Sequence, residues 1–127
     1  MDKKHILVID DDGSVRLLMR KILEPAGYRV SEAKNALEAF SIDPKDAPDL
    51  VILDLAMPGI SGHKVLSAFK SDKSFRAPVL IVSAHTDPDS TQAVTAAGAD
   101  GFLAKPVRRE QLLGIISDLL SKRDSQP

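Results

Sequence analysis

Acidic residues, a hydroxyl and an ammonium recur along this 127-residue sequence, each directly after or at the end of a short apolar segment. The residues concerned are Asp10, Asp11, Asp12, Asp54, Ser83 and Lys105. Several carboxylates that converge in one crevice repel one another unless they are neutralised. A hard divalent cation is the usual solution because it takes oxygen ligands. Mg²⁺ fits better than Ca²⁺, since it typically uses one or two carboxylates together with waters and a phosphate oxygen.

A neutralised cluster of this kind could accept a phosphoryl group. Phosphoryl transfer needs mainly positioning and charge neutralisation, and the Ser83 hydroxyl and the Lys105 ammonium can bind the remaining phosphoryl oxygens. Asp54 would be the nucleophile in this interpretation, and the product would be an acyl phosphate. Each residue alone also has an ordinary structural interpretation, since an acid after a strand commonly caps the next helix, as Asp12 or Ser14 could here. These ordinary interpretations require acids, a hydroxyl and a lysine to fall independently at the ends of four separate apolar segments, so a shared site is favoured.

Five segments are predicted to be strands because they are short, apolar and bounded by turn residues. Three are rich in β-branched residues, and two are each preceded by a Gly turn signal. Their near-continuous apolarity, rather than alternation, favours a parallel sheet that is covered on both faces. The predicted strands are His5–Ile9, Tyr28–Ser31, Leu50–Leu53, Val79–Val82 and Gly101–Ala104.

Helical spacing of apolar residues separates these strands. A β-α unit repeated five times, with right-handed crossovers, predicts an α/β fold with a five-stranded parallel sheet. The doubly wound, flavodoxin-like strand order 2-1-3-4-5 follows, and ligands of such sheets bind outside the carboxyl ends of the strands. The predicted helices are Ser14–Leu23, Asn35–Phe40, Ser61–Phe69, Ser90–Ala97 and Arg109–Leu120.

Length and composition indicate one domain, which we expect over residues 1–122, with a polar tail or linker stub at 123–127. Lys and Arg number 17 against 18 Asp and Glu, so no global charge draws the chain to nucleic acid or to an anionic membrane. Cysteine is absent, which excludes disulfides, thiolate catalysis and Cys-based zinc sites. The sequence shows neither a signal peptide nor an apolar run long enough to span a membrane, so we expect a cytoplasmic protein.

Four motifs in order resemble the receiver domains of two-component response regulators, and the resemblance covers nearly the whole chain. The family has an acidic pair after the first strand, a phosphoacceptor followed closely by Met-Pro-Gly, a Ser or Thr followed by Ala, and a Lys-Pro pair. In this sequence these are Asp10-Asp11, Asp54 with Met57-Pro58-Gly59, Ser83-Ala84 and Lys105-Pro106. Gly13 stands where the family frequently has Pro, so the first helix could start differently.

The resemblance implies a metal site as well as a phosphoacceptor. Asp54 would accept the phosphoryl group. Asp11 and Asp54 would bind Mg²⁺ directly, with Mn²⁺ as an alternative ion, and Asp10 would bind it largely through water. The backbone carbonyl of Ala56 would supply a further ligand.

The resemblance also assigns roles to residues of the last two strands. Ser83 and Lys105 would hold the phosphoryl oxygens, and the Lys105–Pro106 peptide bond would be cis. Phe102 occupies the position of the family's switch aromatic, which moves inward when the hydroxyl is drawn towards the phosphate. A plain core phenylalanine is the alternative interpretation of Phe102.

Partners follow from the resemblance too. The phosphoryl donor would be the phosphohistidine of a sensor histidine kinase or of a histidine phosphotransfer protein. The output would be a downstream protein or a fused domain, reached through the surface of the fourth helix, fifth strand and fifth helix. No direct contact with nucleic acid or membrane is expected. Such a domain catalyses only its own phosphorylation and dephosphorylation.

Two other interpretations compete with this one. The run from Asp10 to Ser14 also fits the Asp-x-Asp-Gly-Ser/Thr opening of haloacid-dehalogenase-type phosphatases, with Asp10 as nucleophile and Asp12 as general acid. That interpretation leaves the Asp54 motif unexplained and finds no second acidic motif after Lys105. A pseudo-receiver without phosphotransfer would lack Asp54, Asp11 or Lys105, and all three are present.

Overall fold

The computed structural model of the chain describes residues 3–57, 59 and 61–125, so Pro58 of the Met-Pro-Gly motif and the ends of the chain lie outside the described residues. Five parallel strands form one sheet in the order β2-β1-β3-β4-β5. The strands are β1 (His5–Ile9), β2 (Arg29–Ala33), β3 (Leu50–Leu53), β4 (Val79–Ser83) and β5 (Gly101–Ala104). The predicted α/β class and strand order are confirmed. The second strand lies later in the sequence than predicted because it pairs with β1 along its whole length.

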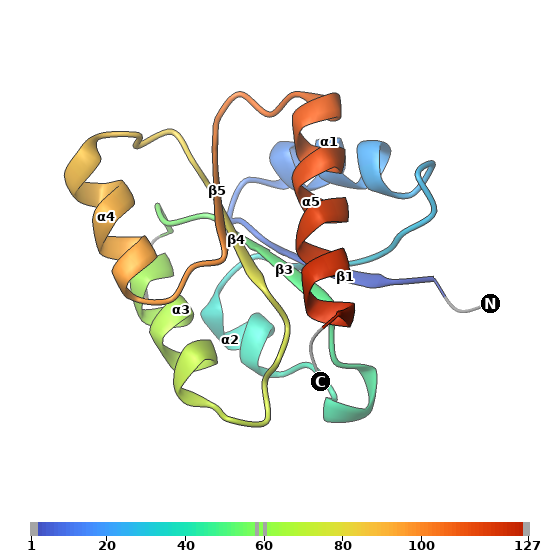
Figure 1. Cartoon of the computed structure of the whole chain (residues 1–127), viewed down its shortest axis with the longest axis horizontal. Coiled ribbons are helices and arrows are strands. Elements are labelled where there is room, and N and C mark those ends of the chain that lie inside the picture. The colour runs from blue at the N-terminus through green and yellow to red at the C-terminus, as the bar shows by residue number, and fades with distance from the viewer. Residues whose placement is uncertain (1–2, 58, 60, 126–127) are drawn as a thin grey trace.

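Helices alternate with the strands along the whole chain (Figure 1). They are α1 (Gly13–Leu23), α2 (Ala36–Phe40), the 3₁₀ helix η1 (Pro44–Asp46), α3 (Gly62–Ser71), α4 (Pro88–Ala96) and α5 (Arg109–Asp124). Helix α1 begins one residue earlier than predicted because the Asp12 carboxylate caps it, accepting from the Ser14 N–H at 2.9 Å. Helix α4 begins two residues earlier because Asp87 caps it and Pro88 needs no N–H in the first turn.

Helix α5 continues four residues beyond its predicted end at Leu120. Its last turn is tied to the sheet, since the Arg123 guanidinium donates to the Asp49 carboxylate at 2.7 Å and to the Asp49 carbonyl at 3.2 Å. The segment expected to be a polar tail is therefore helical as far as Asp124. The division of the chain at residue 122 stays a prediction.

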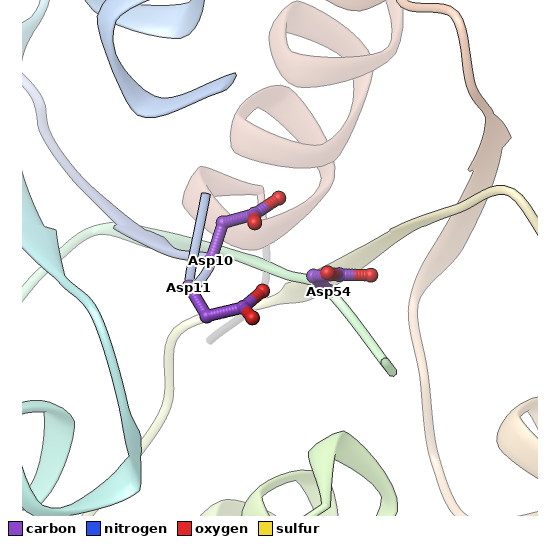
Figure 2. A group of neighbouring side chains, drawn as sticks. All are labelled: Asp10, Asp11 and Asp54. Carbon is purple, nitrogen blue, oxygen red and sulfur yellow. The ribbon is translucent and has the colours of Figure 1, made fainter. Parts of the chain in front are cut away.

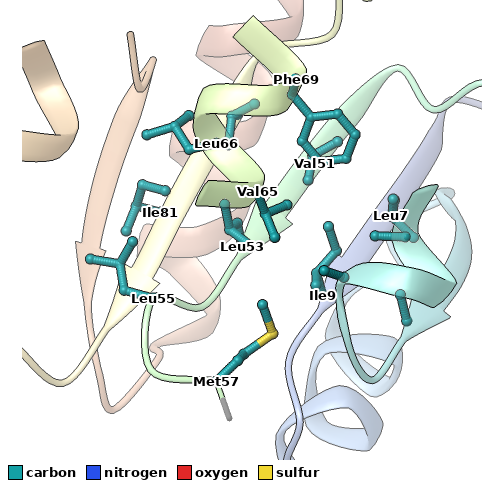
Figure 3. Close-up of a cluster of buried hydrophobic side chains, with 14 of the residues drawn as sticks. Leu7, Ile9, Val51, Leu53, Leu55, Met57, Val65, Leu66, Phe69 and Ile81 are labelled. Atoms are coloured by element: carbon teal, nitrogen blue, oxygen red, sulfur yellow. The ribbon is translucent and has the colours of Figure 1, made fainter. Parts of the chain in front are cut away.

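Apolar side chains cover both faces of the sheet, as the unbroken apolar strands predict. Alternate residues of β1, β3 and β4 point to opposite sides. Leu7, Leu53 and Ile81 pack with α2, α3 and Val94 of α4 on one face (Figure 3). Their neighbours in sequence pack with α1 and α5 on the other face. Figure 1 shows the same division of the helices around the sheet.

Strand register sets the positions of the residues that follow each strand. In β1 and β3, Ile9 pairs with Leu53, so the residues after these two strands lie next to each other. In β4 and β5, Ser83 pairs with Ala104. The four predicted strand-end positions therefore share the carboxyl edge of the sheet. Within the described part of the chain, none of the helices is both long and apolar enough to cross a membrane.

Candidate functional site

Three carboxylates meet where β1 and β3 end. Asp10 and Asp11 follow β1, and Asp54 follows β3. One carboxylate oxygen from each residue lies within 4.8 Å of the other two. Figure 2 shows Asp10 and Asp11 reaching from the end of β1 towards Asp54. Asp10 and Asp54 are 3% and 5% exposed, whereas Asp11 faces solvent, so two negative charges are buried and the third lies at the surface of the crevice.

Lys105 reaches this cluster from the end of β5. Its Nζ lies 3.1 Å from Asp10 Oδ2 and 3.5 Å from Asp54 Oδ2. Burial alone would lower the pKa of Lys105, but the hydrogen bond to Asp10 and the charges of Asp10 and Asp54 raise it. The side chain therefore remains an ammonium. One positive charge faces three carboxylates, which leaves the cluster negative.

The excess of negative charge affects the pKa of Asp54. Burial raises its pKa, and the nearby Asp10 charge raises it further; the Ala56 N–H, at 3.2 Å from Oδ1, and Lys105 offset only part of the rise. A cation bound among the three carboxylates would lower the pKa of Asp54 again, because its positive charge opposes both the burial and the repulsion from Asp10. Three oxygen donors held together by two adjacent strands are the ligands that a hard divalent cation takes. The residues present therefore fit the predicted type of metal site.

The loop after β1 is held by hydrogen bonds that fix the direction of the Asp10 side chain. The Asp12 N–H donates to Asp10 Oδ1 at 2.9 Å. The Arg16 guanidinium donates to the Asp10 carbonyl at 2.5 Å and to Glu32 on β2 at 2.8 Å. The Asp12 carboxylate is itself used as the cap of α1, where it accepts from both the backbone N–H and the hydroxyl of Ser14.

Ser83 and Lys105 are joined through their backbones at the ends of β4 and β5. The Ser83 carbonyl accepts from the Lys105 N–H at 2.9 Å. The Ser83 side chain is fully buried, and its hydroxyl accepts from the His85 N–H at 3.0 Å. The Lys105–Pro106 peptide bond is cis, the isomer that the resemblance implies. Phe102 is half-buried and packs against the apolar cluster on the α2–α3–α4 face.

The structure thus brings Asp10, Asp11, Asp54 and Lys105 into one cluster and places Ser83 on the same edge of the sheet. The Ala56 N–H also reaches this cluster, whereas Phe102 lies further back along β5.

Gly62 supports the position of Asp54 and was missed from the sequence. Its N–H donates to the Leu55 carbonyl at 3.1 Å, which packs the start of α3 against the chain just after β3. A Cβ atom at Gly62 would lie 2.4 Å from the Asp54 carbonyl oxygen and 2.6 Å from Leu55 Cα. Only glycine fits so close to another backbone. A Gly at the second position of the helix predicted over Ser61–Phe69 was the available signal.

The match to protein-family models assigns residues 6–117 to the response regulator receiver domain. Sporulation initiation phosphotransferase F of Bacillus subtilis is 32% identical over 121 residues, which cover 94% of this chain and 96% of that protein. The response regulator MprA of Mycolicibacterium vanbaalenii is 37% identical over 118 residues, which cover 93% of this chain. The chain spans about half the length of that relative, which it covers to 51%.

The comparison with solved structures also finds receiver domains. A CheY-like response regulator receiver domain protein from Methanospirillum hungatei superimposes with a TM-score of 0.89 at 27% identity. The match covers 99% of this chain and all of that one.

We expect Asp54→Asn to stabilise the metal-free protein. The folded-state pKa of Asp54 is raised, so the ionised carboxylate opposes folding at neutral pH, and the stability advantage of Asp54→Asn over the wild type should shrink as the pH falls through that pKa. Thermal unfolding in a chelator measures both effects. Mg²⁺ should then raise the midpoint of the wild type but not that of Asp54→Asn. Asp118→Asn, at an exposed position on α5, is the control and should change neither result. A lower midpoint for metal-free Asp54→Asn than for the metal-free wild type would contradict the conclusion that the carboxylate cluster carries excess negative charge.

We expect Gly62→Ala to lower the free energy of unfolding by roughly 1–3 kcal/mol, because the added methyl group meets rigid backbone. Gly114→Ala is the matched control, since a Cβ atom there, within α5, has no neighbour within 4 Å. This control should be neutral or stabilising by up to about 1 kcal/mol. Urea denaturation of the two variants decides the question, and equal effects would show that the close approach at Gly62 is relieved without cost.

Proposed function

The chain belongs to the family of response regulator receiver domains, and we propose that Asp54 is its phosphoacceptor. A receiver domain of a two-component system is a signalling phosphoacceptor rather than a classical enzyme. The observation that supports Asp54 over Asp10 is that its buried carboxylate is held less tightly. Lys105 Nζ lies 3.5 Å from Asp54 Oδ2 but 3.1 Å from Asp10 Oδ2, and the backbone N–H on the other oxygen is at 3.2 Å for Asp54 but 2.9 Å for Asp10. A carboxylate oxygen there has a positive group next to it that can hold an incoming phosphoryl oxygen.

The proposed reaction is a transfer between two side chains. An oxygen of the Asp54 carboxylate attacks the phosphorus of a phosphohistidine, a P–O bond forms, and the P–N bond breaks as the imidazole leaves with its electron pair. Lys105 and the Ser83 hydroxyl bind phosphoryl oxygens. Asp10, Asp11, Asp54 and the Ala56 carbonyl would hold Mg²⁺ or Mn²⁺. The bound ion would supply charge neutralisation for the carboxylates and for the phosphoryl oxygens.

Switching is proposed to run through β4 and β5. The Ser83 hydroxyl would turn from the His85 N–H towards the phosphoryl group. Phe102, half-buried three residues before Lys105, would then move inward against the apolar cluster it already contacts. The surface of α4, β5 and α5 would carry the change to a partner.

The partners proposed for this chain follow from the family. Receiver domains work with histidine kinases or phosphotransfer proteins, and we propose one of these as donor. The output would be a downstream protein or a fused domain. The receiver would occupy residues 1–122 and act in the cytoplasm, with the last five residues as a tail or linker stub whose first two residues extend α5.

The phosphatase alternative requires Asp12 as a general acid. Hydrogen bonds from the Ser14 side chain and backbone hold the pKa of Asp12 below its ordinary value. A carboxylate that caps a helix in this way is poorly suited to deliver a proton. This contact favours Asp54 over Asp10 as the reacting carboxylate.

Acetyl phosphate with Mg²⁺ should add one phosphoryl group, about 80 Da, to the wild-type chain, and Asp54→Asn should abolish the addition. Asp118→Asn controls for the loss of one carboxylate. Intact mass spectrometry measures the result. Undiminished labelling of Asp54→Asn, together with loss of labelling in Asp10→Asn, would instead support the phosphatase mechanism.

Lys105→Ala should separate phosphorylation from switching. The three carboxylates remain, so Mg²⁺ binding should persist, but the phosphoryl group loses the ammonium that links it to β5. We expect phosphorylation to leave the backbone NMR shifts of α4 and β5 nearly unchanged in this variant, whereas they move in the wild type. Lys64→Ala, at an exposed lysine of α3, should behave as the wild type. Normal shift changes in phosphorylated Lys105→Ala would refute the proposed role.

A further inference from the structure

A small basic groove lies at the opposite end of the sheet from Asp54. Pro78, directly before β4, and Asp100, directly before β5, line it, so it sits at the amino ends of these strands. The groove has a volume of about 180 Å³. Its charged lining consists of four cations and one acid, namely Lys70, Arg76, Lys122, Arg123 and Asp100. The whole chain has a net charge of -1, so this concentration of positive charge is local.

Two of the cations are held in place by carboxylates. Lys70 Nζ lies 2.6 Å from Asp100 Oδ2, which also accepts from the Val79 N–H at 2.8 Å. Arg123 donates to Asp49 at 2.7 Å, and Asp49 in turn accepts from a backbone N–H of β1. The two carboxylates are thereby anchored to the sheet. These pairs fix the positions of Lys70 and Arg123 at the groove before any ligand binds.

The other two cations have no such partner. Arg76 and Lys122 are exposed, and neither forms an ion pair with any residue that the structure describes. Helices α3 and α5 both end near the groove, and the partial negative charge of their carboxyl ends offsets some of the positive charge. Four positive charges against two carboxylates, those of Asp49 and Asp100, still leave an excess of positive charge at the groove that a bound anion would neutralise.

We propose that the basic groove binds a compact phosphate-bearing anion. Arg76 and Arg123 carry guanidinium groups, which match phosphate oxygens in a bidentate manner, and Lys70 and Lys122 add point charges. The cations surround one small hollow rather than forming a stripe along a helix or strand, which favours a compact ligand over an extended acidic peptide. The groove lies at the far end of β4 and β5 from Ser83 and Lys105, so this anion is distinct from the phosphoryl group on Asp54.

NMR titration with inorganic pyrophosphate tests the proposal in the absence of divalent cations, against sodium chloride at matched ionic strength. We expect saturable shifts at Val79, Asp100 and the last turn of α5. Arg76→Gln/Lys122→Gln should weaken binding about tenfold, as loss of two surface charge contacts predicts. Lys64→Gln/Lys73→Gln removes the same charge outside the groove and should change the affinity less than twofold.

Several results would overturn the proposal. Shifts that do not saturate, or equal weakening in the two double variants, would show only diffuse attraction. Shifts confined to Asp10, Asp11 and Lys105 would place the anion at the other end of the sheet. Tighter binding of tetraglutamate than of pyrophosphate would assign the groove to an acidic peptide. ADP, titrated in parallel, should bind at the same residues, and tighter binding than pyrophosphate would identify a nucleotide as the source of the phosphates.

Discussion

Repulsion between carboxylates at the ends of β1 and β3 is the constraint on which the functional end of this molecule depends. Parallel pairing of Ile9 with Leu53 forces the next residues, Asp10 and Asp54, to lie side by side. Both are buried, and among the residues that the structure describes Lys105 alone forms an ion pair with them. Burial and repulsion raise the pKa of Asp54, so the fold holds this carboxylate in a place where additional positive charge is favourable.

The rest of the fold keeps this unfavourable arrangement in place. Apolar layers on both faces of the sheet fix the strands, and the strand ends then have little freedom. Three local contacts add to this restraint: Asp12 caps α1, Arg16 binds the Asp10 carbonyl, and Gly62 lets α3 approach the backbone of Asp54. Because the packed strands hold this excess of negative charge in place, a bound cation or phosphoryl group changes the free energy of the folded protein.

The strands and the functional cluster could be predicted because both follow from local signals: buried strands are apolar runs, and ligands of parallel sheets bind at their carboxyl ends. Helix starts were predicted less well: Asp12 was only one of two candidate caps, and the helix start that Asp87 and the following Pro88 signal was overlooked. Contacts between distant segments could not be read at all. Arg16 meets Glu32 across 16 residues, and the basic groove gathers cations from α3, the loop before β4 and the end of α5.

Reductive trapping of the phosphorylated residue tests the central claim most directly. Borohydride reduces an aspartyl phosphate to homoserine, and tandem mass spectrometry of the digested chain then locates the altered position. After treatment with acetyl phosphate and Mg²⁺, we predict homoserine at position 54 and unaltered aspartate at positions 10 and 11. Homoserine at position 10 would contradict this account, as would a phosphorylated chain with no homoserine at all.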